Sequence, residues 1–272
     1  MQINVREAKT IITKSQLPET DYVINPYTGC QHACIYCYAE FMIRFTGHKG
    51  EKWGTFLDVK RFDIEKIKPD RYNGKSILIS SVTDPYQQAE AKYQNTKKIL
   101  QKLIGTTAEI SILTKSALVK RDIDLFKQFE SIKVGISLST LNKDLSRKLE
   151  PFTSSPKTRL NALKEIHDSC ISTYIFISPL FPWITEYEQI INYSKAYVNL
   201  VMFENINFRP HNKHRIMTMI KNEFPNLLES YKSLMKNPIE WNSIEDSIRN
   251  YCKQNNVKAE IYFHHGGFKK NR

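Results

Sequence analysis

The 272-residue sequence contains no run of about 18 apolar residues, the length that a membrane-spanning helix needs. Its first segment, MQINVREAKTIITKSQ, lacks the apolar core of a signal peptide. The sequence also has no low-complexity tract and no linker rich in Gly, Ser or Pro. We therefore expect a cytoplasmic protein that forms one fairly large domain, or one domain with a modest appendage.

The chain has a surplus of positive charge. Its formal net charge is +12, with lysines spread along the whole sequence. Such a charge favours polyanionic partners, with nucleic acid first among them, but dispersed lysine is also typical of a solvated basic surface. Hydrophobic residues make up 41% of the sequence, including 14 Tyr and 14 Phe, so the chain can form a sizeable core.

Cysteine is scarce, yet three of the five cysteines lie in the segment NPYTGCQHACIYCYAE, residues 25–40. In a reducing compartment, clustered cysteines indicate metal ligands or catalytic thiols. A zinc site would have to use His32 as its fourth ligand within one short loop. A redox pair at CIYC would leave Cys30 unexplained. A 4Fe-4S cluster fits better, since three thiolates leave one iron open to a small molecule.

Apolar, β-branched runs alternate with helical patterns along most of the chain. This order predicts βαβ units and a parallel sheet that forms a curved sheet or an incomplete barrel. The expected strands cover 21–27, 76–82, 109–114, 133–139, 172–180 and 197–204. The expected helices run through AEFMIRF and near 93–104, 119–130, 156–168 and 185–195.

The C-terminal part, 210–272, predicts two or three helices and a final strand, AEIYFHH. We expect this part to pack on the open edge of the barrel or over its mouth. The predicted domains are therefore a barrel over 1–209 and an extension over 210–272. Polar residues follow the strands of the barrel, in SSVTDP, LTKS, SLST, SPLFP and FEN. In parallel α/β folds the active site lies at these carboxyl ends.

The motif C-x3-C-x2-C, with Tyr36 before its last cysteine, resembles the signature of the radical S-adenosylmethionine (SAM) superfamily. Further segments, among them SSVTDPYQQAE, VGISLSTLNKDLSRKLEP and FENINFRP, resemble its spore photoproduct lyase-like branch, which includes the radical SAM mobile pair proteins. The resemblance covers roughly residues 20–210. It implies an α/β fold, a partial (β/α)6 TIM-like barrel with a C-terminal helical extension, and an enzyme that reductively cleaves SAM to a 5′-deoxyadenosyl radical.

The same resemblance implies which residues hold the cofactors. The expected ligands of the 4Fe-4S cluster are Cys30, Cys34 and Cys37. The expected SAM-binding residues are Tyr36, Tyr38, Ser80, Ser81, Thr83, Asp84, Lys115, Ser137, Ser139, Glu150, Arg159 and Pro179. Tyr36 and Pro179 would contact the adenine, and Lys115 would face the SAM carboxylate. Hydroxyls and a carboxylate in SSVTDP suit the SAM ammonium group.

Each of these assignments has a simpler alternative. Tyr36 could serve packing alone, SSVTDP could be a polar turn, and Lys115 an ordinary loop lysine. Ser137 and Ser139 share a face of their strand and could simply line the core. Glu150 and Arg159 could form an ion pair that stabilises a loop.

The resemblance leaves the substrate open. The best-known member of the branch repairs a thymine dimer in spore DNA with a cysteine near the second strand, and SSVTDP has no cysteine. We consider an enzyme acting on nucleic acid, an enzyme acting on a peptide, protein or small molecule, and a non-catalytic iron-sulfur module that binds nucleic acid. The expected partners are a reductant such as flavodoxin or ferredoxin, and a paired radical SAM protein.

Overall fold

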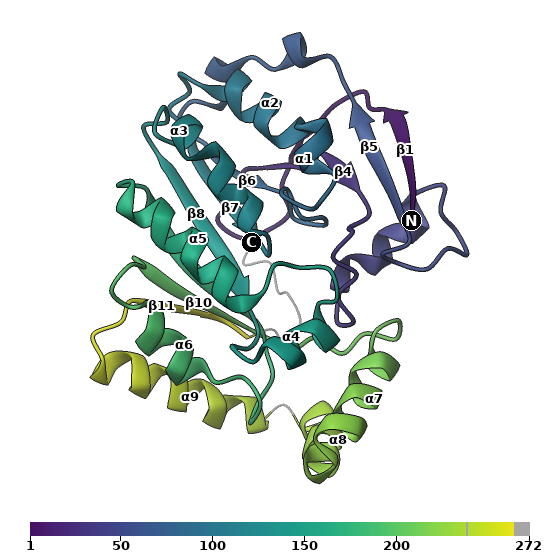
Figure 1. The fold of residues 1–272 in the computed structure, drawn as a ribbon, viewed down its shortest axis with the longest axis vertical. Helices are drawn as coiled ribbons and strands as arrows, with labels where there is room; N and C mark the ends of the chain where they lie inside the picture. Colours follow the sequence, from purple (N-terminus) through teal and green to yellow (C-terminus); the bar gives the residue numbers. More distant parts are fainter. Residues whose placement is uncertain (238, 264–272) are drawn as a thin grey trace.

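The computed structural model describes residues 1–237 and 239–263, which form an α/β fold (Figure 1). Its main sheet has eight strands in the order β11-β10-β9-β8-β7-β6-β3-β2, and all neighbouring pairs are parallel except β2 with β3. The strands are β2 (Ile12–Lys14), β3 (Tyr22–Ile24), β6 (Ser76–Ile79), β7 (Glu109–Thr114), β8 (Ile132–Leu138), β9 (Ser172–Leu180), β10 (Leu200–Asn205) and β11 (Ala259–Tyr262).

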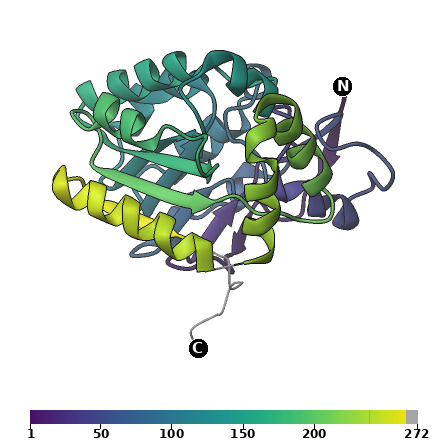
Figure 2. The ribbon, with the colours of Figure 1, turned by 90° about the horizontal axis from the view of Figure 1, so that it is seen from below.

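Helices cover the outer side of this curved sheet (Figures 1 and 2). The α-helices are α1 (Glu90–Tyr93), α2 (Asn95–Leu103), α3 (Ile123–Phe126), α4 (Lys143–Leu149), α5 (Pro156–Asp168), α6 (Tyr187–Ser194), α7 (Lys213–Glu223), α8 (Leu228–Lys236) and α9 (Ile239–Gln254). The 3-10 helices are η1 (Tyr38–Phe45), η2 (Ile64–Lys66), η3 (Pro69–Tyr72), η4 (Ala117–Asp122) and η5 (Pro225–Leu227).

The predicted partial barrel is confirmed. Its six expected strands correspond to β3, β6, β7, β8, β9 and β10, which are neighbours in that order. The predicted final strand is β11, and it pairs in parallel with β10 at the edge of the sheet, so the barrel has a seventh parallel strand. The two histidines at the end of AEIYFHH lie outside the described residues. The boundary between 209 and 210 stays a prediction.

Helix α5 shows how closely a strong local pattern can predict an element. Ser155 caps it by accepting a hydrogen bond from the Thr158 amide, and Pro156 occupies its first turn. Its buried positions recur at helical spacing, including Leu160, Leu163 and Ile166. The structure therefore places this helix at the predicted residues 156–168. The segment AEFMIRF, in contrast, forms the 3-10 helix η1.

A second sheet was not predicted from the sequence. It has the order β1-β5-β4, with β1 (Gln2–Glu7), β4 (Tyr27–Thr28) and β5 (Phe56–Arg61). Strand β1 is exposed along almost its whole length and β4 has two residues, so neither carries a clear hydrophobic pattern. This small sheet matters because β4 leads directly into the cysteine loop.

The C-terminal helices α7 and α8 stand apart from the helices around the sheet (Figure 1). Helix α7 contacts the barrel at α4, where Lys148 Nζ lies 2.5 Å from Glu223 Oε2. No helix within the described residues is both long and apolar enough to span a membrane.

Candidate active site

The cysteine loop, residues 29–37, follows β4 and contains Cys30, Cys34 and Cys37. Cys30 is buried, Cys34 and Cys37 are half-buried, and all three thiols are free. The loop is held by main-chain contacts, since the Ile35 amide donates to the Leu149 oxygen at 3.0 Å. The Gln31 amide donates to Gln87 Oε1 at 2.8 Å. The three thiols therefore lie on one loop that is anchored to the end of α4 and to the segment between β6 and α1.

Burial raises the pKa of all three thiols above their ordinary value. A thiol that coordinates iron is deprotonated outright, because the metal charge outweighs such burial effects. Within residues 1–237 and 239–263, no group of three or more His, Cys, Asp or Glu side chains is arranged to hold a single metal ion. In a cluster, by comparison, each thiolate binds a separate iron atom.

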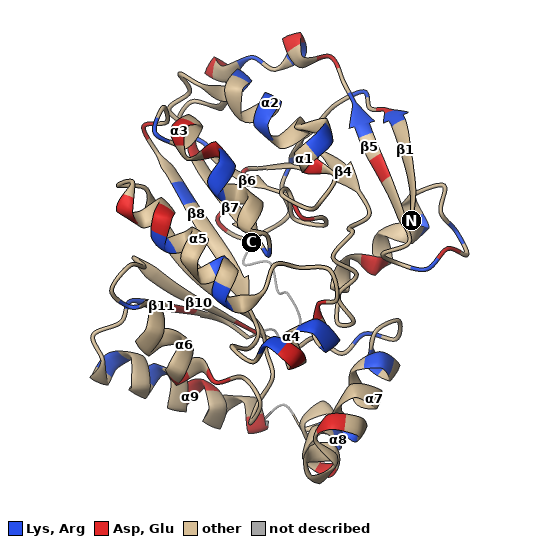
Figure 3. Cartoon of the chain, in the orientation of Figure 1, with Lys and Arg blue, Asp and Glu red and all other residues tan. Residues whose placement is uncertain are grey.

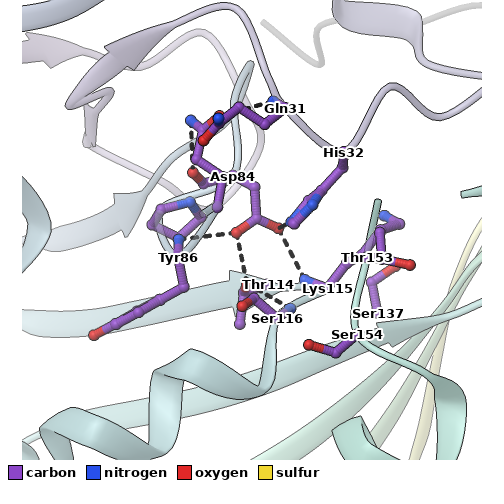
Figure 4. A network of polar contacts seen from close by, with 12 residues as sticks. Gln31, His32, Asp84, Tyr86, Thr114, Lys115, Ser116, Ser137, Thr153 and Ser154 are labelled. Atoms are coloured by element: carbon purple, nitrogen blue, oxygen red, sulfur yellow. Dashed lines mark hydrogen bonds and ion pairs between the residues drawn. The ribbon is translucent and has the colours of Figure 1, made fainter. Parts of the chain in front are cut away.

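A network around Asp84 ties the cysteine loop to the carboxyl ends of β6 and β7 (Figure 4). Asp84 accepts hydrogen bonds from the Tyr86 amide at 2.9 Å, the Thr114 hydroxyl at 2.6 Å and the Lys115 amide at 2.8 Å. His32 Nε2 lies 3.2 Å from Asp84 Oδ2, without the geometry of a hydrogen bond. The structure thus gives both Asp84 oxygens protein partners, and its SAM-binding role stays a prediction.

The pKa of Asp84 shows that its carboxylate is held in the charged form. Burial raises this pKa, but the His32 ring and the hydrogen bonds from Thr114 and Lys115 outweigh it and bring the pKa to about 2. His32, which the sequence offered only as a weak zinc ligand, is therefore a neighbour of Asp84.

Glu150 and Arg159 form the predicted pair, and it is almost completely buried. Arg159 Nη2 donates to Glu150 Oε2, and Arg159 Nη1 donates to the Ser137 oxygen at 2.6 Å. The Tyr36 hydroxyl donates to the other Glu150 oxygen. Burial raises the pKa of Glu150, but Arg159 and Lys115 outweigh burial and the net pKa is lowered. The pair therefore orders the segment after α4 and fixes Tyr36.

Lys115 lies at the end of β7, half-buried, with its ammonium group 5.7 Å from the centre of the Tyr36 ring. Among the described residues, its Nζ atom forms no hydrogen bond or ion pair. Burial lowers its pKa, but the charges of Cys34 and Glu150 outweigh burial and the pKa is raised. A cation that stays protonated in this position can bind an anionic group of a ligand.

The residues of SSVTDP lie in the turn after β6. Ser80 adopts a φ of 69°, and its buried hydroxyl has no hydrogen-bond partner within the described residues. Ser81 donates its amide to Asn25 Oδ1 at 2.9 Å, and Thr83 donates its hydroxyl to the Gly29 oxygen at 2.5 Å. Of these residues, Ser80 is the one that offers an unused polar group to a ligand.

Ser137 lies in β8 and Ser139 directly follows this strand, and their hydroxyls share one acceptor, as expected for residues on one face. Both hydroxyls donate to the Ser178 main-chain oxygen, at 3.0 Å and 3.2 Å. Pro179 follows Ser178 and is buried. The Ser178 hydroxyl in turn donates to Glu204 Oε2 at 2.6 Å. The ends of β8, β9 and β10 are therefore joined by hydroxyl groups at the mouth of the barrel.

Tyr38 follows the last cysteine, and its hydroxyl donates to the Ser81 main-chain oxygen. The residue is 45% exposed, and partial desolvation together with the nearby Glu204 and Cys37 raises its pKa. A cavity of about 250 Å³ lies elsewhere, at the amino ends of β10 and β11, and is lined by residues such as Lys195 and Asn255. It is distant from the cysteines in the fold and forms no part of this site.

Comparison with known proteins identifies the family. Residues 24–192 match the radical SAM superfamily. This chain belongs to the radical SAM superfamily. An uncharacterized protein of Methanocaldococcus jannaschii is 38% identical over 251 residues, which cover 92% of this chain and 93% of that protein. An uncharacterized protein of Mycobacterium tuberculosis is 28% identical, and the match covers 51% of its length.

Two solved structures share the fold. Spore photoproduct lyase complexed with dinucleoside spore photoproduct superimposes with a TM-score of 0.70, at 18% identity, over 96% of this chain and 82% of the lyase. Streptococcus suis SuiB bound to the precursor peptide SuiA gives a TM-score of 0.57, at 15% identity, over 89% of this chain and 48% of SuiB. The predicted lyase-like branch is therefore confirmed for the fold.

Radical SAM proteins use a 4Fe-4S cluster and SAM, and a variant of the lyase has been solved with bound SAM. The residues of this chain fit both groups. Three thiols on one loop are suitable iron ligands. Within the described residues, the Lys115 ammonium and the Ser80 hydroxyl have no hydrogen-bond partner, and these groups are chemically suited to the carboxylate and ammonium groups of SAM. Radical SAM enzymes also need a reductant.

Sequence analysis missed the residues that support the cysteine loop from elsewhere in the chain. Asn212 is fully buried and its Nδ2 donates to the Tyr36 oxygen at 2.9 Å. Arg215 Nε donates to the Ile35 oxygen at 3.1 Å, and its Nη2 donates to Glu40. No local pattern distinguishes these polar residues from other side chains at the start of a helix.

Proposed function

We propose that Cys30, Cys34 and Cys37 hold the 4Fe-4S cluster and that the protein reductively cleaves SAM in order to act on nucleic acid. The observation that carries this proposal is the placement of Lys115 beside three thiols at the carboxyl ends of the barrel strands, where its ammonium group has no hydrogen bond or ion pair within the described residues. The cluster and SAM together supply an electron and a 5′-deoxyadenosyl radical. The protein supplies binding, orientation and shielding.

Several side chains have distinct parts in this proposal. Lys115 binds the SAM carboxylate, and the Ser80 hydroxyl accepts from the SAM ammonium group. Tyr36 is held rigidly, because its hydroxyl is bonded to Glu150 and its ring packs edge-on at 6.0 Å against Phe181. Glu150 and Arg159 support SAM binding indirectly, because they hold Tyr36 and the carboxyl end of β8 in place. Tyr38 lines the opening through which a substrate reaches the site.

Two observations support nucleic acid as the substrate class. The net charge of +12 favours a polyanion. The lyase that shares the fold has been solved with a dinucleoside photoproduct. Lys and Arg lie on β1, β5, α2, α4, α5 and α7, with acidic residues among them, so the charge is distributed over several elements (Figure 3). The turn 80–85 contains no cysteine, so we propose a base reaction other than plain thymine-dimer repair.

A peptide substrate is the second candidate. SuiB, whose fold is similar, has been solved with its precursor peptide. Tyr38 and Glu204 interact electrostatically, and a phenol and a carboxylate at this position can bind a peptide as well as a base. A paired radical SAM protein would then present or share the substrate.

The test uses anaerobically reconstituted protein with SAM and dithionite. The readout is 5′-deoxyadenosine, measured with DNA, with RNA, with peptide mixtures and with no addition. We expect its formation to rise with nucleic acid and to be lost in Cys34→Ala. A rise with peptides alone would favour the second candidate, and no 5′-deoxyadenosine from a cluster-loaded protein would refute the enzyme proposal.

A further inference from the structure

Trp53 places a buried hydrogen-bond donor beside the cysteine loop. The residue is 5% exposed and belongs to a small buried cluster with Cys30, Ala39 and Phe56, against which Cys37 packs. Its indole Nε1 atom is buried and has no hydrogen-bond partner within the described residues. An unsatisfied buried donor costs about 1–3 kcal/mol, so a protein that retains one usually has a partner for it in another state.

The main chain holds this indole against the loop. Gly54 has a φ of 88°, and a Cβ at this position would lie 2.5 Å from Ala33 Cβ, so only glycine lets the segment approach so closely. The Phe56 ring packs edge-on against Trp53 at 5.8 Å between centroids. The indole is thus fixed between β5 and the loop that carries the three thiols.

Cys37 packs against the buried cluster that contains the Trp53 indole. Burial is the largest influence on the pKa of Cys37 and raises it. The Ala39 amide, Lys115 and the Trp53 indole each lower this pKa. A neutral thiol is a weak acceptor, whereas a thiolate bound to iron is a strong one. The Trp53 N–H group is therefore a suitable donor to the Cys37 sulfur in its charged, cluster-bound form.

We infer that Trp53 donates a hydrogen bond from Nε1 to the Cys37 sulfur when this sulfur ligates the cluster, and that this bond raises the cluster reduction potential. The inference rests on the proposed function of Cys37. Reduction adds one negative charge to the cluster, and a hydrogen bond to a ligating sulfur stabilises the more negative state. Trp53 is thus a positioning residue that acts on the cluster through the Cys37 sulfur.

The experiment compares reconstituted wild-type protein with Trp53→Phe by redox titration monitored by electron paramagnetic resonance. We expect iron content to be unchanged and the reduction potential to shift to a more negative value. Trp241→Phe is the matched control, since Trp241 is a buried tryptophan that packs against Phe263 far along the chain, and its potential should equal that of wild type. Water entering the site in place of the indole would raise the potential, so the sign separates the two effects.

A second variant covers the case in which Trp53→Phe loses its cluster. In that variant 3-benzothienylalanine replaces Trp53, which keeps the bicyclic shape and removes only the N–H group. A potential equal to that of wild type, or higher, in a cluster-loaded variant overturns the inference. Failure of the wild-type protein to assemble a cluster would instead refute the proposed function of the cysteines.

Discussion

Asn212 Nδ2 donates a hydrogen bond of 2.9 Å to the main-chain oxygen of Tyr36, a residue 176 positions earlier in the sequence. The same amide group contacts the Asn207 oxygen at 3.1 Å, and Asn212 Oδ1 accepts from the Arg209 amide at 2.8 Å. The start of α7 is therefore joined to the loop segment between Cys34 and Cys37. Through this hydrogen bond, the C-terminal part of the chain helps to fix the conformation of the cysteine loop.

Replacing Asn212 by Ala should loosen the cysteine loop. We expect the free energy of unfolding to fall by about 1–3 kcal/mol, because the Tyr36 oxygen loses a buried donor. We also expect the reconstituted cluster to be lost faster to a chelator, which visible absorbance would follow. Asn192→Ala is the control, since Asn192 is exposed and its hydrogen bond to the Tyr251 hydroxyl lies far from the loop. Equal rates of cluster loss in both variants would contradict this prediction.

Replacing Cys30, Cys34 or Cys37 by Ala should prevent cluster assembly. Each variant removes one of three thiolate ligands, and a cluster with two protein ligands is not retained. Iron and sulfide content after anaerobic reconstitution is the measurement. Cys170→Ala should assemble the cluster as wild type does, because Cys170 is exposed and follows α5 at the opposite end of the strands. An intact cluster in Cys30→Ala would exclude it as a ligand.

Replacing Lys115 by Met should weaken SAM binding while preserving the cluster. A charged hydrogen bond contributes about 1.5–3 kcal/mol, so we expect the dissociation constant to rise roughly 10- to 100-fold. Calorimetric titration of cluster-loaded protein with SAM gives this value. Lys120→Met is the control, because Lys120 forms a half-exposed ion pair with Glu165 at 3.0 Å. An unchanged dissociation constant in Lys115→Met would remove Lys115 from the SAM site.

Replacing Glu150 by Ala should destabilise the protein strongly. Arg159 would keep its charge at a position with 0% exposure, and breaking such a buried pair costs about 3–5 kcal/mol. Glu223→Ala breaks the half-exposed pair with Lys148 and should cost less than about 1 kcal/mol. Denaturant unfolding of both variants is the measurement. Similar losses in the two variants would show that the buried pair contributes no more than a surface pair.

His48 should make the stability depend on pH. It lies 2.7 Å from Glu51 and 2.9 Å from Asp58, whose carboxylate also contacts Arg6 at 2.8 Å. Burial lowers the pKa of His48, but hydrogen bonds to Asp58 and Glu51 outweigh it, so the pKa lies above its ordinary value of 6.5. Because the folded-state pKa is raised, this contribution is complete below pH 6.5 and is lost as pH rises through the folded-state pKa.

The measurement is the free energy of unfolding of wild type and His48→Gln between pH 5.5 and pH 9, values chosen to span the range in which histidine titrates. We expect the difference between the two proteins to be largest at low pH and to shrink as pH rises. A constant difference over this range would show that the pKa of His48 is the same in the folded and unfolded states, and would contradict this prediction.

Local patterns in the sequence were sufficient for the barrel and for the residues of the cysteine loop. The six strands of the barrel are continuous apolar, β-branched runs, and α5 has a capping serine and a helical stripe of buried residues, so short-range physics predicts them. The three cysteines lie within eight consecutive positions, and their spacing together with the family resemblance predicts a shared iron-sulfur cluster. The small sheet was missed because its strands are short or exposed.

What the tertiary structure decided is how distant polar groups meet. The pairing of Asp84 with His32, the contact of Asn212 with Tyr36 and the approach of the Trp53 indole to the cysteine loop join segments far apart in the chain. Such contacts cannot be predicted from a periodic sequence pattern, because a single buried polar side chain leaves no such pattern. Its partner is set by how whole helices and strands pack together. The sequence therefore determined which thiol, ammonium and hydroxyl groups the chain offers, and folding determined which side chains hold those groups in place.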